Sequence, residues 1–161
     1  ESVADHSYRT AVLAMILADR LDVDKDKLIK MALVHDLGES IIGDVVIERG
    51  ASIKNTGHLR FNKEKNALKK VLSYLSNGKE YLDLWIEYEE QKSKEAIILK
   101  QLDKLEMSIQ AVEYEQSDNK KLDEWLINSE KYITHKALKK IFDKLKSKRS
   151  KKLSSNQKLN G

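Results

Sequence analysis

Two histidines and two aspartates in this sequence stand where their side chains could share one metal ion. His6 and His35 lie on the apolar stripes of two segments with helical periodicity, and Asp36 directly follows His35. Asp103 interrupts the apolar stripe of a third such segment, where a carboxylate is costly unless it is paired or bound to a cation. Two imidazoles and two carboxylates would form an N₂O₂ site that suits a divalent first-row metal and leaves positions open for water and substrate.

A histidine on an apolar helix face is more often a satisfied core residue than a metal ligand, so the pattern alone leaves both interpretations open. The other two histidines, His58 and His135, are expected at the surface. Trp85 and Trp125 lie in amphipathic segments and are expected in the core. The chain has no Cys, which excludes disulfides, thiolate zinc sites and cysteine nucleophiles.

The elements that must position these residues are predicted to be helices. The chain has 161 residues, no Pro and 6 Gly, and 35% of its residues are charged. This length suits one domain, and the shortage of helix-breaking residues favours an all-α fold. Hydrophobic periodicity predicts helices over residues 3–21, 25–38, 59–75, 79–91, 93–115, 121–129 and 134–146, with a loop over 40–54. Asp22, Asp24 and Asp26 are candidate N-caps for the second helix.

Positive charge is concentrated at the end of the chain. Residues 146–161 contain six Lys or Arg and no acid, so the rest carries a formal charge of −2 against +4 for the whole chain. We expect a domain over residues 1–146 and a basic, disordered, solubilising tail over 147–161, with weak attraction to a phosphate backbone as the alternative. The longest apolar run, over residues 11–18, is far shorter than the ~20 residues of a membrane span. We therefore expect a cytoplasmic protein.

Five short segments carry a resemblance to a known family. They are ESVADHS (1–7), ALVHDLGES (32–40), IGD (42–44), KQLDKLEM (100–107) and VEYE (112–115). In this order they resemble the HD-domain metal phosphohydrolases, whose pattern is H…HD…D, and within them the 5′-deoxynucleotidase group that includes the HD-domain-containing protein 2 family. The similarity extends to about residue 146. It implies a compact HD-domain helical bundle with a metal site between helices.

The resemblance assigns the metal to His6, His35, Asp36 and Asp103. The implied metal is a divalent cation, since Mn²⁺, Co²⁺, Zn²⁺, Ni²⁺ and Fe²⁺ all accept nitrogen and oxygen ligands. Such a cation would lower the pKa of a bound water molecule and neutralise a phosphate oxygen.

Two further acids, Glu39 and Asp44, match the family's other active-site acids. The resemblance implies a general acid/base role for them, or a second cation such as Mg²⁺ bound at Glu39, Asp44 and Val45. Without the resemblance, Glu39 would be interpreted as a surface acid at a helix end and Asp44 as a turn residue.

The reaction implied is hydrolysis of deoxynucleoside 5′-monophosphates to a deoxynucleoside and phosphate. Two alternatives stay open: an HD phosphohydrolase for another phosphoester, such as a cyclic nucleotide or a deoxynucleoside triphosphate, and a non-catalytic helical nucleotide-binding or scaffold protein. Buried acids without a metal would only destabilise a scaffold, which argues against that alternative. Binuclear HD phosphodiesterases have extra histidine ligands between the HD pair and the last aspartate, where this sequence has only His58. Family members that hydrolyse ppGpp usually carry Glu-Asp three residues after the HD pair, where this sequence has Glu39 and Ser40.

The sequence departs from the family pattern at its start. Family members have an upstream helix whose Arg and aromatic side chains help to hold the nucleotide, whereas this sequence starts at Glu1, and we expect it to begin inside a longer protein. Substrate-binding residues are therefore not assigned. The partners expected are a small nucleotide substrate and a second copy of the chain in a homodimer, with neither a membrane nor a nucleic acid.

Overall fold

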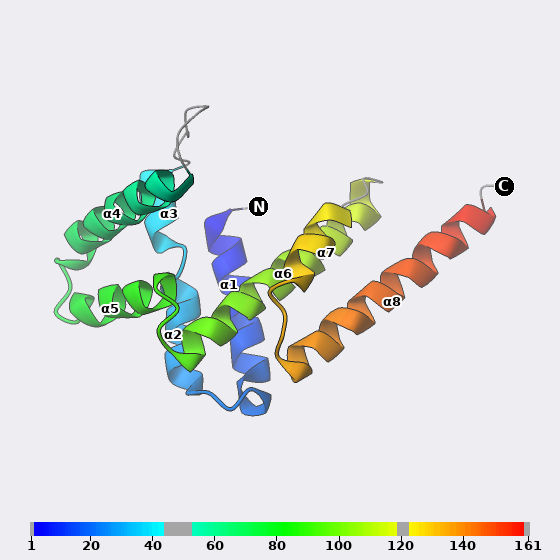
Figure 1. Ribbon diagram of the computed structural model, residues 1–161, viewed down its shortest axis with the longest axis horizontal. Coiled ribbons are helices and arrows are strands. Elements are labelled where there is room, and N and C mark those ends of the chain that lie inside the picture. The colour runs from blue at the N-terminus through cyan, green and yellow to red at the C-terminus, as the bar shows by residue number, and fades with distance from the viewer. Residues whose placement is uncertain (1, 44–52, 119–122, 160–161) are drawn as a thin grey trace. The chain divides into compact units, whose positions relative to one another are not determined.

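A computed structural model describes residues 2–43, 53–118 and 123–159, and in these residues the chain is helical without a strand (Figure 1). Two units are distinct, Glu1–Leu99 and Lys100–Gly161. No helix in the described part of the chain is long and apolar enough to cross a bilayer. The elements are α1 (Val3–Leu17), the 3-10 turn η1 (Ala18–Arg20), α2 (Lys25–Val34), α3 (Leu37–Ile42), α4 (Ile53–Leu72), α5 (Gly78–Glu89), α6 (Lys94–Asp118), α7 (Asp123–Glu130) and α8 (Lys136–Leu159).

The first unit is built around α2. Helix α1 packs on one side of α2 and α5 on another, while α4 packs against both α3 and α5. Leu68, Leu72 and Trp85 form a buried cluster at the α4–α5 contact, and the ring of Phe61 stacks on Trp85 with 5.3 Å between centroids. The prediction that Trp85 is a core residue is confirmed.

The start of α2 is fixed by one of the three aspartates predicted as caps. Asp24 is the N-cap, and its side chain accepts a hydrogen bond from the Lys27 backbone N–H at 3.0 Å. The backbone N–H of Asp24 in turn donates to the Glu95 carboxylate at 3.1 Å. Since an N-cap satisfies amide groups that lack a helical partner, these bonds set where α2 begins.

The prediction of one helix over residues 25–38 is wrong at its last turn. Helix α2 ends at Val34, Asp36 adopts φ −105° and ψ 9°, and α3 begins at Leu37. Ser40 was expected in a loop but lies in α3, because α3 packs against α4 and this tertiary contact extends the helical stretch. Gly43, with φ +68°, ends α3 in a conformation that favours glycine.

The second unit ties its helices together through polar side chains. The Gln101 side-chain oxygen on α6 accepts hydrogen bonds from the backbone N–H groups of Thr134 and His135, at 2.9 and 2.7 Å, just before α8 begins. Trp125 on α7 is 50% exposed, so its predicted core position is wrong. Helix α7 is only 8 residues long and buries Leu126 and Ser129 instead.

Helix α8 continues where the sequence predicted disorder. It runs to Leu159, past the boundary expected at residue 146. Arg149 donates to both carboxylate oxygens of Glu115 at 2.5 and 2.7 Å, and to Asp123 at 2.6 Å. Because the Glu115 and Arg149 side chains are largely buried, this two-pronged ion pair holds α8 beyond the expected boundary.

Replacing either of two glycines in the first unit by alanine is expected to change the free energy of unfolding, with opposite signs. A Cβ added at Gly78 would lie 1.8 Å from the Leu72 carbonyl oxygen, whereas a Cβ at Gly57 on α4 would meet nothing within 4 Å. We expect Gly78→Ala to lower the free energy of unfolding by at least about 1–3 kcal/mol, because backbone must move. We expect Gly57→Ala to raise it by up to about 1 kcal/mol through helix propensity. Thermal and urea denaturation measure both, and equal stabilities for the two variants would contradict this packing.

Candidate metal centre

Three of the predicted metal ligands converge in the first unit. The Nε2 atom of His6 lies 3.6 Å, and that of His35 3.4 Å, from the same Asp36 carboxylate oxygen, Oδ2. The centroids of the two imidazole rings are 5.4 Å apart. Helix α1 supplies His6, and the junction of α2 and α3 supplies the other two. Two nitrogen donors and one oxygen donor thus face one another, as a transition-metal site requires.

The break between α2 and α3 makes this convergence possible. Adjacent residues of an unbroken α-helix point about 100° apart, so consecutive side chains do not meet on one face. Asp36 lies outside both helices, in a sparsely populated backbone region that is common at active sites. Its carboxylate can therefore turn back towards His35 as well as towards His6.

The protonation pattern of His35 follows from its neighbours. Its Nδ1 lies 2.7 Å from the backbone carbonyl oxygen of Ala32. A carbonyl only accepts, so Nδ1 carries the proton and donates it, and Nε2 keeps the lone pair that a metal needs. The ring is 2% exposed and meets Tyr88 edge-on, with 5.2 Å between centroids. Orientation and tautomer are thus both fixed by the protein.

The fourth predicted ligand, Asp103, belongs to the second unit. It lies on α6 and is 5% exposed, which confirms the prediction of a buried carboxylate on this stripe. The Nζ atoms of Lys100 and Lys104 lie 3.5 and 3.2 Å from its Oδ2. These two cations offset part of the cost of keeping the carboxylate charged.

Glu39 takes part in a chain of ion pairs that links α3 to α4. Arg60 donates from Nη2 to Glu39 Oε2 at 2.7 Å and from Nε to Glu64 Oε1 at 2.6 Å. The two carboxylates, Glu64 first, raise the pKa of the Arg60 guanidinium above its usual value. Glu64 is 4% exposed, whereas the Glu39 side chain is 36% exposed. A Cβ at Gly38 would lie 2.9 Å from the Glu64 side chain, so glycine lets α3 approach α4 this closely.

Sequence reasoning missed Arg60 and Glu64. Their spacing of four residues is also typical of ordinary surface ion pairs on helices, so only the burial of Glu64 distinguishes them. His58 is exposed on α4, as predicted, while His135 is half-buried and its Nδ1 accepts from the Ala137 N–H at 3.3 Å. Asp44 and Val45, predicted as catalytic or cation-binding residues, lie outside the described residues.

Comparison with known proteins decides the family. A family model for the HD domain matches residues 1–148. The chain belongs to the HD-domain family. The HD domain predicted from the five segments is therefore confirmed, and with it the all-α fold.

Proteins similar to this HD domain include named enzymes. The 5′-deoxynucleotidase HDDC2 of Dictyostelium discoideum is 47% identical over 124 residues, which are 71% of this chain and 63% of that protein. The chain thus spans just under two thirds of this relative's length. The 5′-deoxynucleotidase HDDC2 of Danio rerio is 38% identical over 96% of this chain and 77% of its own length.

A solved structure shares the HD fold. It is described as a predicted metal-dependent phosphohydrolase from Magnetospirillum magnetotacticum, and it matches with a TM-score of 0.68 at 26% identity. The match covers 94% of this chain and 78% of that one. The histidines and aspartate that converge on the α2–α3 junction thus form a candidate metal-binding group within an HD domain.

Replacing the Asp36 carboxylate by a neutral amide tests the metal centre. We expect Mn²⁺ or Co²⁺ to raise the melting temperature of the parent chain, because a ligand that binds only the folded state stabilises it by mass action, about 2.7 kcal/mol at one hundred times the dissociation constant. Asp36→Asn should lose this response, since an amide oxygen is a weaker ligand than a carboxylate. His58→Ala, which removes an exposed histidine, is the matched control and should keep it. Thermal shift and calorimetric titration measure both, and unchanged metal affinity in Asp36→Asn would exclude Asp36 as a ligand.

Proposed function

We propose that this chain is a metal-dependent phosphomonoesterase that hydrolyses deoxynucleoside 5′-monophosphates to a deoxynucleoside and phosphate. The observation that carries the proposal is the convergence of the His6 and His35 Nε2 atoms on one oxygen of Asp36. The 5′-deoxynucleotidase activity named for relatives that cover most of this chain supports the substrate class.

The residues that would hold the metal are His6, His35, Asp36 and Asp103. The donor set fits a divalent first-row cation, because the fixed tautomer of His35 leaves Nε2 available and the carboxylates balance the charge. Asp103 is included because it is a buried carboxylate of the HD-domain pattern. When bound, the cation supplies a water of lowered pKa and neutralises a phosphate oxygen. Mn²⁺, Co²⁺, Zn²⁺, Ni²⁺ and Fe²⁺ all remain suitable on this donor set.

Glu39 is the residue that we assign to proton transfer. Hydrolysis breaks the bond between phosphorus and the 5′-oxygen, and the departing oxygen must receive a proton that the attacking water gives up. A partly exposed carboxylate can exchange protons with solvent, and Glu39 is partly exposed while Glu64 is buried. Arg60 positions the Glu39 carboxylate through its Nη2 donor. Asp44 shares this assignment by family resemblance, or joins Glu39 and Val45 at a second cation such as Mg²⁺.

The quaternary structure and location are separate proposals. Helix α1 exposes Tyr8, Met15 and Ile16, an apolar face that favours a homodimer with a second copy of the chain. A chain without Cys is compatible with the reducing cytoplasm, where nucleotide monophosphates are available. Light scattering of the purified chain measures its oligomeric state.

The substrate class is tested by phosphate release from a panel of nucleotides. We expect a chelator to abolish the activity and Mn²⁺ or Co²⁺ to restore it, because the reaction needs the bound cation. Deoxynucleoside 5′-monophosphates should be hydrolysed at least tenfold faster than ribonucleotides, cyclic nucleotides or deoxynucleoside triphosphates. Preference for a cyclic nucleotide or a triphosphate would contradict the proposed substrate, and activity that survives complete metal removal would contradict the proposed chemistry.

A second prediction separates proton transfer from metal binding. Glu39→Gln keeps the shape of the side chain and should slow turnover by about 10²–10⁴-fold while the first metal still binds. Arg60→Met should lower kcat with little change in KM, and Arg60→Lys should recover part of it, because a lysine can still donate to Glu39. Single-turnover phosphate release, run beside metal titration, measures these effects. A near-normal rate in Glu39→Gln would remove Glu39 from the chemistry.

A further inference from the structure

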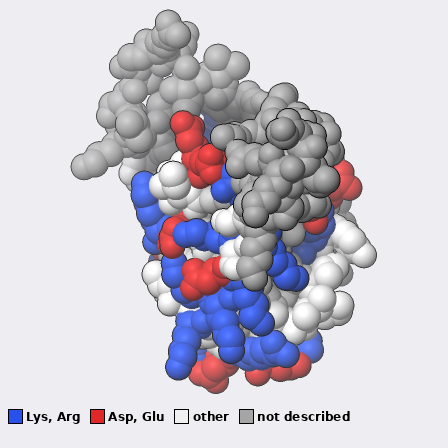
Figure 2. Space-filling view, turned by 90° about the vertical axis from the view of Figure 1, so that its right-hand side faces the viewer, with Lys and Arg blue, Asp and Glu red and all other residues white. Residues whose placement is uncertain are grey.

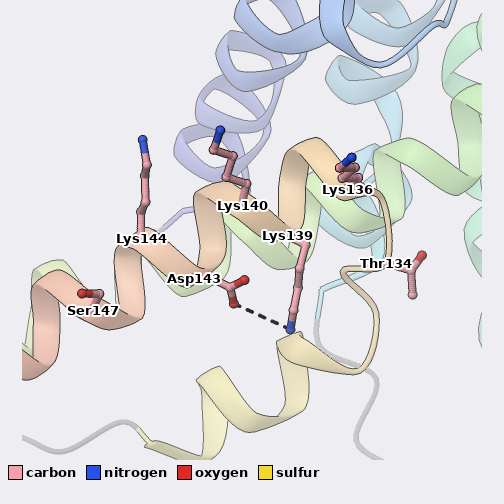
Figure 3. A pocket seen from close by; sticks show the side chains of 7 residues that line it. All are labelled: Thr134, Lys136, Lys139, Lys140, Asp143, Lys144 and Ser147. Carbon is pink, nitrogen blue, oxygen red and sulfur yellow. Dashed lines mark ion pairs between the residues drawn. The ribbon is translucent and has the colours of Figure 1, made fainter.

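Helix α8 carries a row of exposed lysines that winds gently around the helix. Lys136, Lys140, Lys144 and Lys148 follow one another at intervals of four residues, and all four are exposed. At a rise of 1.5 Å per residue, neighbours in this lysine row are about 6 Å apart and the row is about 18 Å long. In Figure 3 the side chains of Lys136, Lys140 and Lys144 extend from the same side of the helix, and the face drawn in Figure 2 shows a gathering of Lys and Arg side chains.

Within the described part of the chain, no acid neutralises the lysine row, unlike Lys139, Lys146 and Arg149 on the same helix. Lys139 pairs with Glu130 at 2.7 Å and with Asp143 at 3.8 Å, and Lys146 pairs with Glu130 at 2.8 Å. These two lysines lower the pKa of Glu130 to about 2. Among the described residues, no acidic side chain pairs with any lysine of the row. Among the described residues, Glu130 and Asp143 thus pair with Lys139 and Lys146, and the four lysines of the row keep their charges exposed.

The chemistry of this face favours a phosphate backbone over a lipid surface. A helix that binds in a membrane interface needs apolar side chains to insert, but Leu138 and Phe142 are both 0% exposed within the second unit. The exposed positions of α8 between residues 136 and 150 hold only Lys, Asp and Ser. Single-stranded nucleic acid is bound through aromatic stacking as well as charge, and this face offers no aromatic ring.

We propose that the lysine row binds the phosphate backbone of duplex nucleic acid without sequence preference. A duplex is a stiff rod with phosphates every 3.4 Å along each strand, so a row of charges that winds gently along one helix can meet successive phosphates with flexible side chains. Lysine is a point charge on a flexible stem, which suits contact with phosphate and carries no base readout. From the sequence, attraction to a phosphate backbone was only the alternative interpretation of the basic tail over residues 147–161. The lysine row begins eleven residues before that tail, inside α8.

Salt dependence tests this proposal with the full chain and a fluorescent 20-base-pair DNA duplex of mixed sequence. Each phosphate neutralised by a lysine contributes about 0.9 to the slope of log affinity against log salt concentration. Lys140→Gln with Lys144→Gln should therefore make this slope shallower by about 1.8 and weaken binding at low salt. Lys69→Gln with Lys70→Gln is the matched control, since it removes two exposed lysines of α4 and the same charge. The control should keep the slope, and both double variants should keep the phosphomonoesterase rate.

Four outcomes would overturn the proposal. They are the absence of duplex binding in the parent chain at low salt, equal loss of slope in the two double variants, a preference of more than about tenfold for one of two unrelated duplex sequences, and tighter, equally lysine-dependent binding to vesicles rich in anionic lipid. The last result would assign the row to a membrane surface. None of these measurements depends on whether the metal centre is active.

Discussion

The hydrogen bond from His35 Nδ1 to the Ala32 carbonyl depends on α2 ending at Val34. Ala32 is among the last four residues of α2, whose carbonyl oxygens lack a helical N–H partner. One of these spare acceptors takes the imidazole proton and leaves Nε2 as the donor atom. The same helix end frees Asp36 from helical geometry, so its carboxylate meets both imidazoles. The end of α2 thus sets both the tautomer of His35 and the position of Asp36, the third candidate ligand.

The elements around this helix end hold it in place. Asp24 and Glu95 fix the first turn of α2, and Tyr88 of α5 packs edge-on against the His35 ring. Across α3, the buried Glu64 would be costly if left alone, since removing a charge from water is expensive. Arg60 offsets that cost and joins Glu64 to the more exposed Glu39. The proposed site therefore combines rigidly held candidate ligands with one acid, Glu39, that stays in contact with solvent.

Much of the fold could be predicted from the sequence, because helical periodicity is a local signal. The convergence of His6, His35 and Asp36 was expected only through the family resemblance, since the residues alone also fitted an ordinary helix core. The break at Asp36 could not be predicted, since no Pro or Gly precedes it and the contact between α3 and α4 decides it. The continuation of α8 beyond residue 146 could not be predicted either, for a similar reason. Arg149 finds Glu115 and Asp123 at sequence separations of 34 and 26 residues, and no local pattern reports such a pairing.

Two sets of polar contacts hold α8 in the second unit, one made by neutral groups and the other by charged groups. Near its first turn, the neutral carboxamide of Gln101 holds the backbone N–H groups of Thr134 and His135. Near residue 149, the helix is held by charged groups. Dissolved ions screen attraction between charges but hardly weaken an amide hydrogen bond. Buried charges are screened much less than exposed ones, so rising ionic strength weakens the contact of Arg149 with the exposed Asp123 first, while the largely buried pair with Glu115 and the amide hydrogen bonds at the helix start persist.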